Sequence, residues 1–199
     1  MRLTTGKRPA PGDSPPGAGH AQEFQRLILP HLDGAYNLAR FLTRDAAMSD
    51  DVVQDALLRA FRSFDQFHGE SPRAWLFAIV RNCCRSALSA QTASGLRLVQ
   101  DEGSSDDHAR PDEADDPEQA LIRAADAELV RKLVGTLAEP FREAIVLRDL
   151  EELSYREIAQ VTGVAMGTVM SRISRGRALL AEQLHGGAGT VADQSRNSQ

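Results

Sequence analysis

Five polar side chains recur at helical spacing between Met166 and Leu180, and their types suit contact with a nucleic acid. They are Thr168, Ser171, Arg172, Arg175 and, at the edge of the set, Arg177. Arginine pairs with phosphates and with guanine, and small hydroxyl side chains reach phosphates or base edges. Residues 165–181 hold no acid, although the chain has 28 of them. The pattern therefore predicts a helix that meets DNA.

The residues just before this helix predict the first helix and the turn of a helix–turn–helix. Ser154 and Glu157 have the spacing of a capping box, which marks a helix start. Gly163 can take the left-handed backbone conformation that a tight turn requires. In a helix–turn–helix the second helix lies in the major groove, with its N-terminal end toward the bases. An ordinary helical hairpin is the alternative, but spacing, cap, glycine and charge together favour DNA binding.

A second set of candidate contacts lies on a helix predicted to start at Ser71 and Pro72, with serine as the cap and proline in the first turn. Arginines line this helix toward Leu88, and the asparagine and serine between them could reach base edges. Its tryptophan could support an unstacked base, although a lone tryptophan more often belongs to a core. The set is Arg73, Trp75, Arg81, Asn82, Arg85 and Ser86. Cys83 and Cys84 are interpreted as small apolar packers, with a redox switch as a minor alternative.

The helix before it is predicted to start at Ser49, as its cap, and to run through Phe64. Its apolar residues form one face, and its opposite face carries Asp51, Gln54, Asp55, Arg59 and Arg62. For an isolated helix a solvated face is the simplest interpretation. Apolar residues also recur at helical spacing from Glu23 to Leu42, where Pro30 should kink or divide the segment.

Two further helices are predicted in the C-terminal half, over residues 120–135 and from Pro140 to Leu150. Alanine, leucine and arginine are the three commonest residues, and they favour helices. The sequence therefore predicts an all-α fold.

The formal charge of the chain is −5, and its acidity is local. Nine acids lie between Asp101 and Glu118, with Arg110 as the one base among them. A segment this polar cannot bury enough apolar surface to fold. We therefore expect two small helical domains, 21–90 and 118–186, joined by a flexible acidic linker, 91–117. The tails 1–20 and 187–199 are predicted to be disordered.

Several classes of protein fit the composition poorly. The two cysteines are adjacent, so they cannot staple a fold and suggest a reducing cytosol. No apolar run reaches the ~18 residues of a membrane span, and the N-terminus lacks the apolar middle of a signal peptide. The five histidines are scattered without metal-ligand spacing, and no nucleophile–base pattern or phosphate loop is seen. An enzyme is therefore not expected, nor a metal site, a cofactor or a small-molecule substrate.

Three motifs, in this order, resemble the extracytoplasmic-function group of the sigma-70 family of bacterial sigma factors, which keeps only domains 2 and 4. They are DDVVQDALLRAFRSFDQF, SPRAWLFAIVRNCCRSAL and, after the acidic linker, EPFREAIVLRDLEELSYREIAQVTGVAMGTVMSRISRGRALL. The resemblance covers about residues 22–185. It implies a cytoplasmic protein with sigma domain 2, a helix–turn–helix sigma domain 4 and no catalytic residue, because RNA polymerase supplies the catalysis.

The resemblance also implies a partner for each element. The polar face with Asp51, Gln54, Asp55 and Arg59 would bind core RNA polymerase, whose β′ and β subunits are the expected partners. The loop from Asp65 to Ser71 and the helix after it would open the −10 element of promoter DNA, with Asn82 at a family position for a flipped base. The helix from Met166 to Leu180 would read the −35 element. The linker resembles a segment that threads near the active-site channel, and an anti-sigma factor, often membrane-bound, is a further implied partner.

Three positions depart from the usual pattern of the family. Met170 stands where many relatives carry lysine or arginine, and Ser86 replaces an asparagine of some relatives. Gly176 lies inside the reading helix, where many relatives have alanine, and should cost up to ~1 kcal/mol of helix stability.

Other functions remain alternatives to the sigma factor. The nearest is a conventional helix–turn–helix regulator that is not a polymerase subunit, and its N-terminal half would need a ligand pocket or phosphoacceptor pattern that this sequence lacks. A small helical enzyme lacks a catalytic motif here. A protein-binding adaptor does not explain the acid-free arginine helix.

Overall fold

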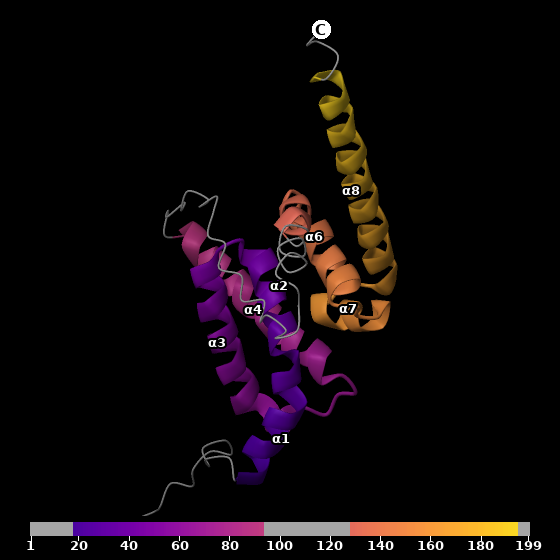
Figure 1. Cartoon of the computed structure of the whole chain (residues 1–199). Coiled ribbons are helices and arrows are strands. Elements are labelled where there is room, and N and C mark those ends of the chain that lie inside the picture. The colour runs from indigo at the N-terminus through magenta and orange to yellow at the C-terminus, as the bar shows by residue number, and fades with distance from the viewer. Residues whose placement is uncertain (1–17, 94–127, 195–199) are drawn as a thin grey trace, which may run out of the picture.

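The computed structural model describes residues 18–93 and 128–194, and all the regular elements in these two stretches are helical (Figure 1). The first stretch holds α1 (Ala18–Ile28), a 3-10 turn (Leu29–His31), α2 (Leu32–Thr43), α3 (Ala46–Ser63), a second 3-10 turn (Phe64–Gln66) and α4 (Pro72–Ala93). The second holds helical residues 128–135, α6 (Glu139–Ile145), a π-helical turn (Val146–Leu150), α7 (Tyr155–Thr162) and α8 (Met166–Gln194). The predicted all-α class is confirmed.

Local signals placed several of the helix boundaries correctly. The break predicted at Pro30 is confirmed, because Pro30 lies in the 3-10 turn that separates α1 from α2. Ser71 caps α4 as predicted, since its Oγ accepts the amide hydrogen of Ala74 at 3.2 Å. The predicted acidic linker lies almost wholly outside the described residues, as does most of the N-terminal tail.

The predicted start of α3 at Ser49 is wrong. α3 begins at Ala46, and its cap is Asp45, whose carboxylate accepts the amide hydrogen of Met48 at 2.9 Å. Ser49 is fully buried, with its hydroxyl 2.8 Å from Thr43 Oγ. Both residues are good caps, and the aspartate precedes two alanines that extend the helix.

The helix–turn–helix has the predicted local geometry. Ser154 Oγ accepts the amide hydrogen of Glu157, and the Glu157 carboxylate accepts that of Ser154, so the capping box is complete. Gly163 ends α7 with φ +70° and turns the chain into α8. α8 runs to Gln194, beyond residue 186, where the sequence placed the end of the domain.

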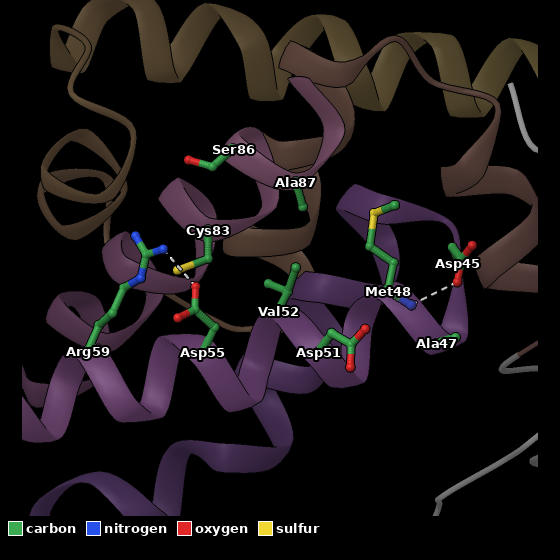
Figure 2. A pocket seen from close by; sticks show the side chains of 10 residues that line it. All are labelled: Asp45, Ala47, Met48, Asp51, Val52, Asp55, Arg59, Cys83, Ser86 and Ala87. Atoms are coloured by element: carbon green, nitrogen blue, oxygen red, sulfur yellow. Dashed lines mark hydrogen bonds and ion pairs between the residues drawn. The ribbon is translucent and has the colours of Figure 1, made fainter. Parts of the chain in front are cut away.

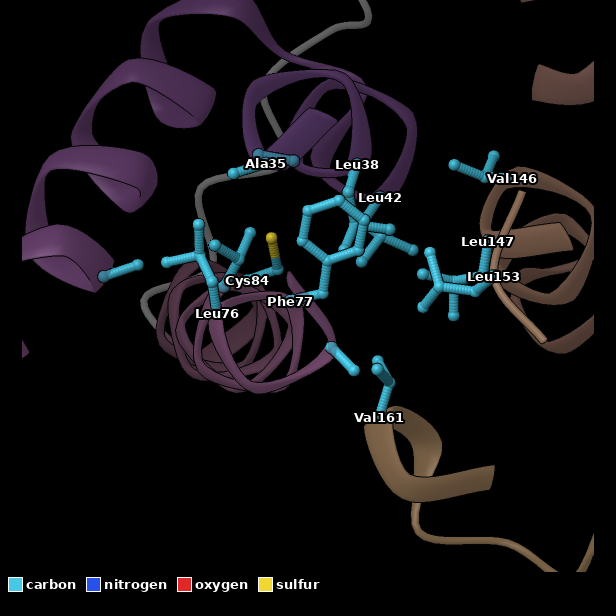
Figure 3. Close-up of a cluster of buried hydrophobic side chains, with 14 of the residues drawn as sticks. Ala35, Leu38, Leu42, Leu76, Phe77, Cys84, Val146, Leu147, Leu153 and Val161 are labelled. Carbon is cyan, nitrogen blue, oxygen red and sulfur yellow. The ribbon is translucent and has the colours of Figure 1, made fainter. Parts of the chain in front are cut away.

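One continuous core joins the two described stretches. α2, α3 and α4 pack on one another, and α8 packs on α6 and α7. α4 also contacts α7, and α2 contacts α6, so the halves lie side by side (Figure 1). The shared core includes Leu38 and Phe77 from the first stretch and Val146 and Leu147 from the second, all fully buried (Figure 3).

Candidate nucleic-acid surfaces and a partner-binding groove

The first turns of α8 present the predicted DNA-reading side chains away from the core. Val169 and Ile173 are at most 2% exposed and anchor the helix. Thr168, Ser171 and Arg175 are exposed, and Arg172 is partly buried. This arrangement leaves two hydroxyls and two guanidinium groups on the outer side of a helix whose N-terminus follows a tight turn. Such a surface suits a major groove and its phosphates.

Arg177, at the edge of the set, already has a partner. Its Nε donates to Asp149 Oδ2 at 3.1 Å, and Nη2 bonds the other carboxylate oxygen. These hydrogen bonds raise the pKa of Arg177 above its ordinary value, with the charge of Asp149 adding to the effect. Among the described residues, no carboxylate is bonded to Arg172 or Arg175. These two arginines therefore differ from Arg177, which is bonded to Asp149.

Gly176 has a packing role that its position in the sequence did not reveal. It is buried where α8 crosses α6, and a methyl group there would lie 2.7 Å from Ile145 Cγ1 and 3.5 Å from the Phe141 carbonyl oxygen. The glycine therefore allows the two helix backbones to approach closely.

The six predicted contacts on α4 divide by exposure. Asn82, Arg85 and Ser86 are exposed, while Arg73 and Trp75 are partly buried and Arg81 is buried. The Trp75 ring packs 5.1 Å from the Phe67 ring and 6.3 Å from the Phe64 ring, measured between centroids. Trp75 thus sits in an aromatic cluster that includes the loop before α4, with part of its surface open to solvent.

Arg73 and Arg81 contact acids of the second stretch, which the sequence reasoning missed. Arg73 pairs with Glu151 of the loop after the π-helical turn, and Arg81 pairs with Glu143 of α6. These partners are 78 and 62 residues away along the chain. No spacing pattern connects residues so distant, so only the fold could reveal these pairs.

A groove of about 550 Å³ opens between α3 and α4 (Figure 2). It is lined by Asp45, Ala47, Met48, Asp51, Val52, Asp55, Arg59, Cys83, Ser86 and Ala87. Three of the four predicted polymerase contacts line it, and Gln54 is exposed on the same helix. Asp55 and Arg59 form an exposed ion pair of 2.8 Å. The groove is acidic on its α3 side, which suits a basic partner surface.

The sequence missed three groove residues, Asp45, Ala47 and Met48, because it started α3 at Ser49. With Asp45 as the cap, all three fall at the start of the same helix as Asp51. Ser86, predicted as a DNA contact, also lines the groove, so the two predicted sets meet there.

The cysteine pair packs as predicted. Cys83 and Cys84 are 3% and 0% exposed. Burial raises the pKa of both thiols, that of Cys84 to about 12. A reactive cysteine needs a thiolate, so these environments favour an inert packing role.

In the parts of the chain that the structure describes, no group of three or more metal-binding side chains is found. Within the same residues, none of the helices has the length and apolar character of a membrane span.

Each of the two described stretches matches a different family model. A family model described as Sigma-70 region 2 matches residues 27–94, and one described as Sigma-70, region 4 matches residues 127–180. The extracytoplasmic-function (ECF) RNA polymerase sigma-E factor of Haemophilus influenzae is 34% identical over 175 residues, 83% of this chain and 89% of that protein. The sigma-H factor of Pseudomonas aeruginosa is 33% identical over 80% of this chain and 84% of that protein.

Two solved structures also align with most of this chain. The sigma factor RpoE from Bartonella quintana, in complex with the anti-sigma factor NepR, aligns with a TM-score of 0.64 and 28% identity over 82% of this chain and 98% of that one. CnrH, in complex with the cytosolic domain of CnrY, aligns with a TM-score of 0.59 and 28% identity over 85% of this chain and 92% of that one.

Proposed function

Because the chain belongs to the ECF sigma factors of RNA polymerase, we propose that its three surfaces divide the work of promoter recognition. As a sigma factor, the protein associates with core polymerase and directs transcription from specific promoters. The region 2 match speaks against a conventional helix–turn–helix regulator, because it covers the half of the chain that such a regulator would use as a sensor.

The groove between α3 and α4 is the proposed docking site for core polymerase. Asp51, Asp55 and Arg59 line it and are all exposed, with Gln54 beside them. The acids would meet a basic face of the β′ coiled coil, and Met48 and Val52 would provide the apolar centre that protein interfaces use. The groove itself is the observation that carries this assignment.

The exposed residues of α4 are the proposed contacts of the −10 element. Asn82, Arg85 and Ser86 lie free of the core, and Trp75 is partly open beside them. Removing a base from the stack costs a few kcal/mol, which stacking and hydrogen bonds in a fitted site must offset. The polymerase supplies the catalysis. The proposed location of this protein is the cytoplasm, where the polymerase acts.

The start of α8 is the proposed reader of the −35 element. Arg172 and Arg175, to which no carboxylate of the described residues is bonded, carry the prediction. We expect Arg172→Ala and Arg175→Ala each to weaken binding to a −35 duplex by ~1–3 kcal/mol. Arg177→Ala should cost less, because its guanidinium is already bonded to Asp149. Fluorescence anisotropy with a labelled duplex measures all three, and an Arg177 effect larger than the other two would contradict this order.

Reconstituted transcription tests the function as a whole. The purified chain with core polymerase should give run-off transcripts from a subset of genomic fragments, and those fragments identify the promoter. Asn82→Ala should lower open-complex formation by ~10-fold or more, if the lost contact is worth more than 1.4 kcal/mol. Its binding to core polymerase should stay at the wild-type level, since Asn82 is outside the groove. Normal open complexes from the variant would remove Asn82 from the −10 site.

We also propose an anti-sigma factor as a regulatory partner, supported by the solved RpoE relative, whose structure is a complex with the anti-sigma factor NepR. A native protein that co-purifies with the tagged chain and blocks its binding to core polymerase would be that partner. Recovery of core polymerase alone, under every growth condition tried, would count against it.

A further inference from the structure

Two methionine side chains on the first turns of α8 are open to solvent. Met166 is 50% exposed and Met170 is 45% exposed. They lie four positions apart, so their side chains are neighbours on one face of the helix. Neither belongs to the buried core or to the partly buried side chains that pack against it, whereas Val169 and Ile173 of the same turns are buried. Among the residues that the structure describes, the two methionines therefore have no part in the core.

The side chains around this methionine pair favour a nucleic acid as the partner that covers it. Thr168, Ser171 and Arg175 are exposed on the same turns, and residues 165–181 contain no acid. A surface with this charge attracts phosphates and repels basic protein surfaces. We therefore take the partner to be a DNA duplex that the helix enters through the major groove.

The major groove offers one apolar group to a methionine side chain, the C5-methyl group of thymine. The other groups that distinguish the bases in this groove are hydrogen-bond donors and acceptors. A thioether donates no hydrogen bond and accepts only weakly. Packed against those polar groups, Met170 would displace their water without replacing its hydrogen bonds, which costs free energy. A methionine in this groove therefore favours a thymine over the other bases.

Position 170 is one of the three that depart from the pattern of the family, in which many members carry lysine or arginine there. Those side chains donate hydrogen bonds to guanine and to phosphates. Met170 has neither the donors nor the charge, but its unbranched side chain adapts to irregular apolar surfaces. Methionine at this position therefore replaces a contact that suits guanine with one that suits a methyl group.

We propose that Met170 selects a thymine in the −35 element by packing its thioether against the C5-methyl group of that base. Met166, one turn earlier, extends the apolar surface toward the start of the helix. The inference rests on the proposed assignment of α8 to the −35 element, and it adds to that assignment a base preference carried by an apolar contact.

The test removes single methyl groups from the DNA and the thioether from the protein. The probes are promoter duplexes identified by run-off transcription, in which each thymine of the −35 element is replaced in turn by deoxyuridine. Fluorescence anisotropy measures their binding to the full-length chain assembled with core polymerase. One replacement should weaken binding by ~3- to 5-fold, the scale of burying one methyl group. With Met170→Ala the same replacement should weaken binding by less than ~1.5-fold, because the methyl group has lost its partner.

Three further variants separate the apolar contact from general effects of substitution. Met170→Leu keeps an apolar side chain of similar size and should retain most of the deoxyuridine penalty. In a duplex library with a randomised −35 element, Met170→Arg should lose the thymine preference at that position and prefer guanine there. Leu184→Arg adds the same charge at another position of α8, where the side chain is 55% exposed, and should leave every base preference unchanged. Helical content by circular dichroism must match the wild type in each variant.

Three results would overturn the proposal: no deoxyuridine replacement weakens wild-type binding, the penalty is the same with Met170→Ala, or Met170→Arg keeps the base preferences of the wild type. Each could occur while the wild type gives run-off transcripts from its promoters, which would leave the proposed function intact. Absence of wild-type transcripts from every fragment would count against the proposed function itself, and the inference would fall with it.

Discussion

The Gly176→Ala variant should unfold at a lower denaturant concentration than the wild type, although alanine is the better helix former. The added methyl group would press on Ile145 Cγ1 at 2.7 Å, and Ile145 is itself only 2% exposed. Overpacking a core costs ~1–3 kcal/mol, against up to ~1 kcal/mol gained from helix propensity. We therefore expect a net loss of ~1–2 kcal/mol, measured by urea unfolding followed by circular dichroism.

Gly167 provides the matched control on the same helix. It is exposed, and a methyl group there would meet nothing within 4 Å. Gly167→Ala should therefore stabilise the chain slightly, so the two substitutions should have opposite signs. A second check is Ile145→Ala, in which the effect of Gly176→Ala should shrink or reverse, because the opposing atoms are gone. Equal stabilisation by both glycine variants would show that α6 yields to the extra methyl group at no cost.

Reversing the charge of the groove should disrupt polymerase docking. In Asp51→Arg with Asp55→Arg, Arg59 loses its 2.8 Å partner, and a basic partner would meet three arginines in place of two acids and one base. Juxtaposed like charges at an interface cost several kcal/mol. We expect the dissociation constant for core polymerase to rise ~100-fold or more, measured by biolayer interferometry with immobilised core enzyme.

The control makes the same change of net charge outside the groove. Asp33 and Asp50 are exposed on α2 and α3, and neither lines the groove. Asp33→Arg with Asp50→Arg should weaken docking several-fold at most. If both double variants lost binding equally, long-range charge rather than the groove would be responsible, and the docking assignment would fail.

Signals carried by a few neighbouring residues predicted much of the fold. Pro30, the Ser71–Pro72 pair, the Ser154–Glu157 box and Gly163 each act on the backbone within about one turn, so sequence alone reveals them. Ser49 shows where such reasoning fails. Asp45 and Ser49 are both cap types, and the structure buries the serine hydroxyl against Thr43.

The rest of the candidate sites depended on contacts between distant segments. Helical periodicity was enough to predict which side chains of α8 are exposed. It also predicted the polar face of α3. The partners of Arg73 and Arg81 could not be predicted, since helical periodicity relates only residues within a few turns. Gly176 was predicted to lower the stability of its helix. The structure shows that a side chain at this position would collide with Ile145, which lies 31 positions earlier in the chain.

Glu157 links the beginnings of two helices that belong to different halves of the molecule. Its carboxylate accepts the Ser154 amide hydrogen at the start of α7 and the hydroxyl hydrogen of Ser71, which itself caps α4. The Ser154 hydrogen bond, aided by Ser71 and the charge of Arg73, lowers the pKa of Glu157 below its ordinary 4.5. Its contribution to stability is therefore complete above that value and is lost as the pH falls through the lowered pKa.

Acid should consequently fray both helix starts in a single titration. The two helices would then respond to acidification below pH 4.5 as one cooperative unit, with α4 and α7 gaining amide hydrogen exchange together.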